Sequence, residues 1–146
     1  MSPLILDVYD DAAGNILREI YPRYDTVPSF IKNAHQITRE EMVRLPDDVF
    51  GVVLLDEGQK MRKFACVDAG NTALHLLYFM KTGSQLPAEA QDVAMRRLIH
   101  SCDVYGLHNI RKEAAMIGAL GNMQKNAGSN VGNLITAIKE QARGYR

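Results

Sequence analysis

The residues of this sequence best suited to site chemistry are its four histidines, His35, His75, His100 and His108. A helical zinc site typically places two ligands four residues apart, so that both project from one face. No two histidines have this spacing, and His100 and Cys102 are too close together for a tetrahedral site. We therefore predict no metal site, and we expect His75, which lies in an apolar segment, to be a packed histidine with a backbone partner.

Carboxylates, nucleophiles and glycines provide no better candidate for catalysis. The acidic pairs are Asp10 and Asp11, Glu40 and Glu41, Asp47 and Asp48, and Asp56 and Glu57. They fall in predicted turns and helix starts, where a carboxylate already has a local role. No Ser or Cys lies in a nucleophile-elbow motif, and the stretch from Gly118 to Gly132 lacks the closing Gly-Lys-Ser/Thr of a phosphate-binding loop. We predict no catalytic residue and no bound cofactor.

Length and composition are those of one soluble globular domain. The chain has 146 residues, of which 47% are hydrophobic and 23% charged, so it can bury a core without disulfides or metals. Its two cysteines, Cys66 and Cys102, lie in apolar surroundings. We favour buried reduced thiols, and a bridge between the two is the alternative. No run approaches the roughly 18 apolar residues of a membrane span, and the N-terminus does not resemble a signal peptide, so we expect synthesis in a cytoplasm.

Charge is distributed unevenly along the chain, although its formal net charge is zero. Residues 1–59 carry 5 basic and 11 acidic groups, residues 60–110 carry 6 and 4, and residues 111–146 carry 6 and 2. This polarity suits head-to-tail contacts between copies, or an acidic partner for the basic C-terminal tail, and a solvated surface with uneven charge is the commoner explanation. Contact with nucleic acid through this tail stays open, although stacking aromatic residues are scarce there.

Two β-hairpins are expected in the first half of the chain. Apolar residues alternate over residues 4–8, and a second short β-run covers residues 16–21 after a turn that contains Gly14. The run from Phe50 to Leu55 is continuously apolar, which is typical of a strand covered on both faces. A turn at residues 56–59 with Gly58 leads into a return strand that ends at Cys66.

Helix signals are strong from residue 37 onward. Thr38 and Glu41 have the spacing of a capping box, Ile37 can pack on Met42, and Pro46 ends the short helix. A further helix is predicted to begin at an N-cap, with Asp68 well placed and Asn71 and Thr72 as competing candidates, and to end at Gly83. Two more are predicted from Pro87 to Gly106 and over residues 109–120. The link between the helix that ends at Gly83 and the next one is short, so they should be antiparallel neighbours.

The last helix is expected to be an attachment arm. A Gly- and Asn-rich break precedes it, and its narrow apolar stripe is too short to be stable alone. We predict that the stripe packs on a neighbouring subunit, through an interface made of Leu134, Ile135, Ile138, Lys139 and Arg143; docking on the core of its own chain is the alternative. The predicted organisation is one α+β domain over residues 1–121, with N-terminal β-hairpins packed on an antiparallel helix pair, followed by a linker and C-terminal helical arm over residues 122–146.

Residues 45–105 resemble a module of uncharacterised structural proteins of tailed bacteriophages. The residues that carry the resemblance are Leu45 to Phe50, Arg62 to Phe64, Asp68, Asn71 and Thr72, Tyr78 and Phe79, and Leu86 and Pro87 before a helix that ends near Cys102. Ala65 stands where the module has proline. The resemblance covers less than half of the chain and implies a phage context with a structural or binding role, without any transferable chemistry.

These observations together predict a non-enzymatic virion protein. We expect a capsid decoration or head–tail component, made in the host cytoplasm, that contacts other virion proteins and copies of itself and has no membrane partner. The alternative is a cytoplasmic phage accessory protein that binds nucleic acid or a host factor through its basic C-terminal tail. A third hypothesis is a small enzyme whose site forms no linear motif.

Overall fold

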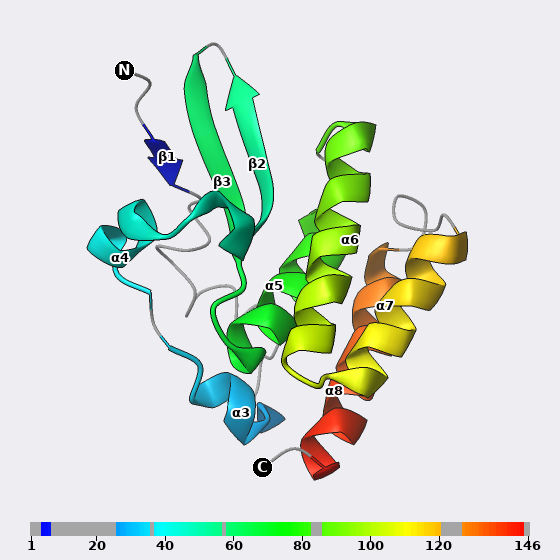
Figure 1. Cartoon of the computed structure of the whole chain (residues 1–146). Helices are drawn as coiled ribbons and strands as arrows, with labels where there is room; N and C mark the ends of the chain where they lie inside the picture. The colour runs from blue at the N-terminus through cyan, green and yellow to red at the C-terminus, as the bar shows by residue number, and fades with distance from the viewer. Residues whose placement is uncertain are drawn as a thin grey trace.

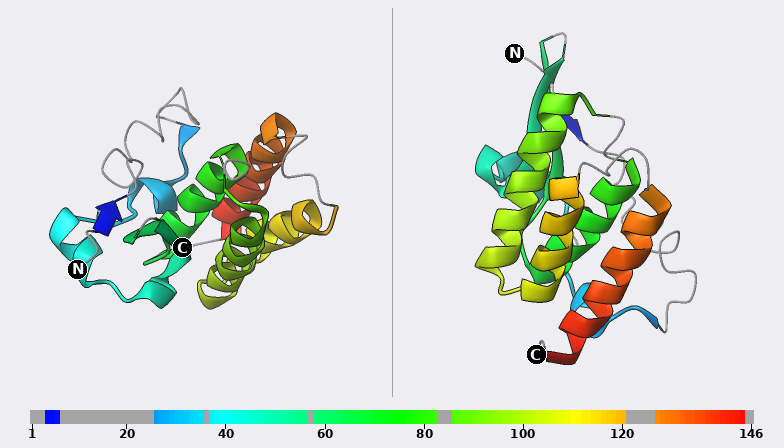
Figure 2. Two further views of the ribbon diagram at one scale, coloured as in Figure 1. Left: turned by 90° about the horizontal axis from the view of Figure 1, so that it is seen from above. Right: turned by 90° about the vertical axis from the view of Figure 1, so that its right-hand side faces the viewer.

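The protein has an α+β fold in which a β-hairpin lies between a helical bundle and a small helical layer (Figure 1). The computed structural model describes residues 4–6, 26–35, 37–56, 58–82, 86–120 and 127–144. The elements are β1 (Leu4–Leu6), α3 (Ser29–Lys32), α4 (Arg39–Arg44), η2 (Asp47–Val49), β2 (Phe50–Asp56), β3 (Gln59–Ala65), α5 (Ala69–Thr82), α6 (Ala88–Val104), α7 (His108–Leu120) and α8 (Ala127–Gly144). Helices α5 to α8 pack together on one side of the hairpin, and α4 lies on the other (Figure 2).

Within the described residues, the sheet contains three strands in the order β1-β3-β2. Strands β2 and β3 form the expected antiparallel hairpin, and Gly58 in its turn has a φ of 77°. We expected β1 to pair in a hairpin with the strand that follows it in the chain. Instead, β1 pairs in parallel with β3, and Leu4 lies opposite Lys60. The second predicted strand, at residues 16–21, lies outside the described residues. The hairpin is also less enclosed than expected, since Leu55 near its tip is 79% exposed.

Side chains of β3 do not alternate regularly between the two faces of the hairpin. Lys63 and Phe64 are adjacent in the chain, yet both face the helices, where the ammonium group of Lys63 lies 5.6 Å from the Tyr78 ring centroid and Phe64 packs edge to face on Tyr78 at 5.6 Å. Arg62 and Ala65 both face the other way, toward α4. The paired register correspondingly passes from Phe50 opposite Ala65 to Val52 opposite Lys63, without a Gly51–Phe64 pair.

The irregularity depends on two residues that face each other across the hairpin. Phe64 has a φ of 65°, a conformation that costs a non-glycine residue about 1–2 kcal/mol. Its ring is almost fully buried and contacts three other rings, so packing offsets this cost. A side chain at Gly51 would lie 3.0 Å from the Phe64 Cβ, which explains the glycine there.

A small second core lies between the hairpin and α4. It consists of Met42, Phe50 and Ala65, with partly buried apolar neighbours that include Ile37. The guanidinium group of Arg62 is buried in the same place, where it donates hydrogen bonds to the carbonyl oxygens of Met42 and Leu45 and lies 4.3 Å from the Phe50 ring centroid. Arg62 therefore joins α4 to the hairpin.

Local signals place α4 and α5 as expected. The capping box of α4 is confirmed, because the Glu41 amide donates to Thr38 Oγ1 at 3.1 Å and the Thr38 amide donates to Glu41 Oε1 at 3.3 Å. The Asn71 amide donates to Asp68 Oδ1 at 2.7 Å, so Asp68 caps α5. His35 lies between the two helix starts, with its amide bonded to Asp68 Oδ2 at 2.9 Å and its ring 2.7 Å from Glu41 Oε2.

The two cysteines are buried thiols, as the sequence analysis favoured. Cys66 follows β3, and Cys102 lies in the last turn of α6. Burial raises the pKa of the Cys102 thiol to about 12, with the neighbouring Cys66 as a smaller contribution. Cys102 is therefore protonated and unreactive near neutral pH.

The last helix does not behave as an arm in the structure. Helix α8 begins at Ala127, so residues 127–133, which belong to the Gly- and Asn-rich break expected before the last helix, are helical. Leu134 and Ile138 are fully buried in the main core of the chain itself, and Ile135 packs against that core. The prediction that a neighbouring subunit covers this stripe is corrected accordingly, because α5 and α7 already cover it.

Candidate interaction surface

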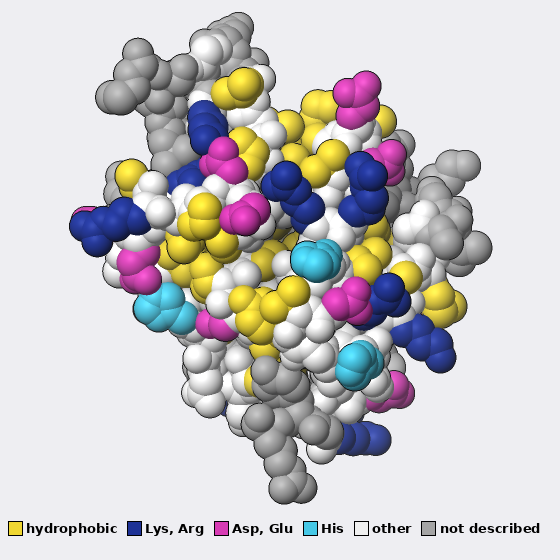
Figure 3. Space-filling view, viewed as in Figure 1, with side chains coloured by type: hydrophobic (Ala, Val, Ile, Leu, Met, Phe, Trp, Pro, Cys, Tyr) yellow, Lys and Arg dark blue, Asp and Glu magenta, His cyan; other side chains and the backbone are white. Residues whose placement is uncertain are grey.

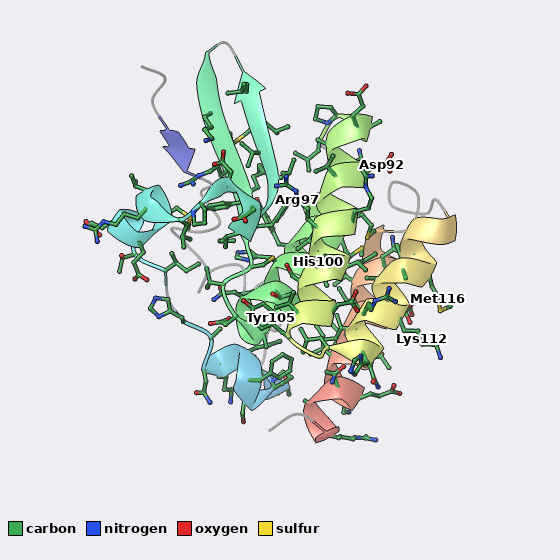
Figure 4. All side chains as sticks on the ribbon, in the orientation of Figure 1. Asp92, Arg97, His100, Tyr105, Lys112 and Met116 are labelled. Carbon is green, nitrogen blue, oxygen red and sulfur yellow. The ribbon has the colours of Figure 1, made fainter. Side chains whose placement is uncertain are left out.

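A stripe of exposed side chains runs along α6, outside both cores. Arg97, His100 and Val104 follow one another at spacings of three and four residues, which places them on the same side of the helix. Arg97 and His100 are exposed, and Val104 has 61% of its surface accessible although it is apolar. Figure 4 shows Arg97, His100 and Tyr105 along α6.

The short helix η2 borders this stripe, and three hydrogen bonds fix their relative position. Arg97 Nη1 donates to the carbonyl oxygen of Phe50 at 3.1 Å. The Cys66 amide donates to the carbonyl oxygen of Val49 at 3.0 Å, and the Tyr105 hydroxyl donates to the carbonyl oxygen of Cys66 at 3.2 Å. Because these bonds tie α6, β3 and η2 together, the surface between them is held in place before any partner binds.

We call this surface the α6–η2 face, and define it by the residues Asp48, Val49, Arg97, His100, Val104 and Tyr105. Val49 and Tyr105 are partly buried at its centre, on either side of Cys66. Figure 3 shows hydrophobic side chains gathered between α4–η2 and α6, with Arg and His side chains on the α6 side. An apolar centre with a polar rim is the usual anatomy of a protein–protein contact.

Charges on the two sides of the face have opposite signs. Asp48 is exposed on η2 and forms no ion pair within the described part of the chain, and Arg97 likewise has no carboxylate partner there. The neighbouring carboxylates are neutralised locally. Lys60 lies 2.6 Å from Asp47 and lowers the pKa of that carboxyl group, while Arg111 lies 2.6 Å from Asp103.

The residues selected from the sequence do not form this surface. Leu134 and Ile138 are buried in the core and Ile135 packs on it, while only Lys139 and Arg143 of the expected interface are exposed on α8. The sequence did contain a signal for the α6–η2 face, because Val104 is an apolar residue off the buried stripe of its helix, aligned with Arg97 and His100.

Two of the four histidines have structural roles, His35 between the starts of α4 and α5 and His75 in the core, whereas His100 and His108 are exposed. His75 is buried in the core, as expected, and its ring centroid lies 6.4 Å from that of Phe64. Among the described residues, no group of three or more His, Cys, Asp or Glu side chains could hold a metal ion. None of the described helices combines the length and the apolar character that crossing a membrane requires.

Comparison with known proteins adds no relative. No family model matches the chain, and neither a curated protein nor a solved structure matches it.

Proposed function

We propose that this protein is a non-enzymatic structural component of a bacteriophage virion, a capsid decoration or head–tail component, that acts through protein–protein contacts. The observation that carries the proposal is Val104. Val104 is 61% exposed although it is apolar, and it lies on the same side of α6 as Arg97, whose guanidinium group is bonded to the carbonyl oxygen of Phe50. The resemblance of residues 45–105 to a phage structural module supports the virion context.

Rigidity is the second support for a contact role. Contacts between preformed surfaces lose little conformational entropy on binding. The hydrogen bonds from Arg97 to Phe50 and from Tyr105 to Cys66 order the α6–η2 face within the single chain. Such a surface suits repeated assembly of many copies better than a surface that must first fold.

The alternative function is a cytoplasmic accessory protein that binds nucleic acid or a host factor through the C-terminal tail. Lys139 and Arg143 are exposed on α8, which this alternative requires. Glu140 is exposed beside Lys139, so the described part of the tail presents a mixed surface and not a continuous basic stripe. Basic side chains that neutralise phosphates would make binding weaken steeply with salt.

Incorporation into phage particles tests the proposal. The gene would be replaced in the phage genome by variants Val104→Glu or Met116→Glu, and the protein quantified in purified, high-salt-washed particles. Met116 is a matched control, because it is also apolar and half exposed but lies on α7, outside the α6–η2 face. We expect wild type and Met116→Glu in the particles and Val104→Glu reduced at least about tenfold. Equal incorporation of both variants contradicts a contact role for the face.

A further inference from the structure

We infer that Gln141 of the last helix is a positioning residue for the α6–η2 face, which it orders through the corner between α6 and α7. The inference rests on the proposed function for the importance of that face. The α6–α7 corner consists of residues 105–107 and joins Val104, the last residue of α6, to His108, the first residue of α7. Any restraint on the start of α7 is therefore a restraint on the chain that leads out of the face.

The first turn of α7 is capped by a side chain from another helix. Leu107 occupies the N-cap position, because the Arg111 amide donates to its carbonyl oxygen at 2.9 Å. A leucine side chain cannot accept a hydrogen bond, as the usual capping residues do. Instead, Gln141 Oε1 accepts a hydrogen bond from the Asn109 amide at 2.8 Å. The cap of α7 thus comes from α8, 32 residues further along the chain.

The packing of α8 determines where Gln141 lies. Leu134, Ile138 and Gln141 follow one another at spacings of four and three residues, so they share one side of the helix. The two apolar side chains are fully buried in the main core, and Gln141 is buried as well. The end of α8 lies beside the start of α7 (Figure 1). Docking of α8 on the core therefore brings the capping side chain to α7.

The α6–α7 corner connects this cap to the face. The Leu107 amide donates to the carbonyl oxygen of Cys102 at 2.8 Å, and the Leu107 side chain is fully buried. Tyr105, the C-cap residue of α6, donates from its hydroxyl group to the carbonyl oxygen of Cys66 at 3.2 Å. Residues of the corner are thus bonded to α6 and to the chain after β3, while Gln141 holds the first turn that follows. Loss of the cap should loosen the corner and the adjoining end of the face.

An ion pair spans the same corner but is a weaker restraint. Arg111 Nε lies 2.6 Å from Asp103 Oδ1, and these side chains are 44% and 47% exposed. Solvent screens such a pair, so it contributes little to stability. A buried hydrogen-bonding group that loses its partner is more costly, because it has already been removed from water. The Gln141 bond should therefore control the order of the corner more than the ion pair does.

Amide hydrogen exchange of the purified full-length chain, measured by NMR, tests the inference. Gln141→Met keeps the length of the side chain and removes the acceptor, and Glu140→Met is the matched control because Glu140 is exposed beside it. In Gln141→Met we expect the amides of Asn109 and of residues 105–107 to exchange at least about tenfold faster, while amides of the β2–β3 hairpin keep their rates. Glu140→Met should match wild type throughout.

Gln141→Glu distinguishes the capping bond from side-chain packing. A glutamate retains an acceptor oxygen at the same reach, and the positive end of the α7 dipole favours its negative charge. It should keep the protection of the Asn109 amide within about threefold of wild type. Equal loss of protection in Gln141→Glu and Gln141→Met overturns the inference. So do unchanged corner amides in Gln141→Met, or hairpin amides that accelerate as much as those of the corner.

Failure of this inference is distinguishable from failure of the proposed function. Unchanged exchange at the corner overturns the role of Gln141 and leaves the virion role intact. Faster exchange at the corner, in a protein whose wild type is absent from particles, supports the role of Gln141 and contradicts the virion role. If both hold, Gln141→Met should be incorporated less than Glu140→Met and Gln141→Glu. Equal incorporation of a variant with a loosened corner overturns the positioning role.

Discussion

Two helical glycines should respond in opposite ways to the same substitution. A Cβ at Gly70 in α5 would lie 2.4 Å from the carbonyl oxygen of Phe30 and 2.6 Å from the Cβ of Ala34. A Cβ at Gly132 in α8 would meet nothing within 4 Å. Gly132→Ala should therefore stabilise the protein by about 0.5–1 kcal/mol, the helix preference of alanine over glycine. Gly70→Ala should destabilise it by about 1–3 kcal/mol, because a backbone carbonyl must move.

Urea unfolding followed by far-ultraviolet circular dichroism measures both free energies. The two variants should differ by about 1.5–4 kcal/mol, with unchanged dependence on denaturant concentration. Gly132→Ala is the matched control, since it makes the same chemical change in a helix without a neighbour. Gly70→Ala as stable as Gly132→Ala would refute the reasoning, because it would mean that α3 and the residues after it do not pack on the start of α5.

Three further predictions concern the core, the α4 cap and the last helix. Leu98→Ala should lower the free energy of unfolding in urea by about 2–5 kcal/mol, because Leu98 is fully buried. Val104→Ala, on the exposed side of the same helix, should change it by less than about 0.5 kcal/mol. Similar losses for the two variants would contradict the assigned buried and exposed faces of α6. The hydrogen bond from His35 lowers the pKa of Glu41 below its ordinary value of 4.5. Wild type should therefore be more stable than Glu41→Gln above pH 4.5 and should lose this advantage as the pH falls through the lowered pKa. Unfolding measured from about pH 7 to about pH 3 checks this, and an advantage that grows on acidification contradicts it. Deleting residues 129–146 should lower the melting temperature substantially, because the main core loses the side chains that α8 contributes to it. A truncated protein that melts like wild type would instead support the hypothesis that the last helix is an attachment arm.

The parts of the fold that the sequence predicted are those specified by neighbouring residues. Thr38 and Glu41 define the start of α4, and Asp68 defines the start of α5, since each capping bond spans only three residues. The boundaries of α5, α6 and α7 and the β2–β3 hairpin follow from the same local chemistry, whereas the start of α8 does not. The α+β class is therefore confirmed by the structure.

The parts that the sequence did not predict depend on contacts between distant residues. Phe64 adopts a positive φ because its ring packs in the core opposite Gly51, and no local pattern indicates this. The stripe of Leu134 and Ile138 looked unpaired along the chain, whereas α5 and α7 cover it in space. Pattern alone identifies an apolar stripe but does not identify its partner.

The candidate surface illustrates the same limit. The exposure of Val104 follows from helical spacing, but the hydrogen bond from Arg97 to the carbonyl oxygen of Phe50 depends on how the end of η2 packs beside α6. The hydrogen bond from Tyr105 to Cys66 joins residues 39 positions apart. A sequence-based search for linear motifs therefore finds the separate residues of the α6–η2 face and not the face itself.

The central claim is that this chain is a structural component of a phage particle that works through contacts of the α6–η2 face. Quantitative mass spectrometry of purified, high-salt-washed particles from the phage that carries the gene tests it most directly. The account predicts the protein in the particles at a fixed ratio to the other structural proteins. A protein that is abundant in the infected cell lysate but absent from the washed particles would contradict the account.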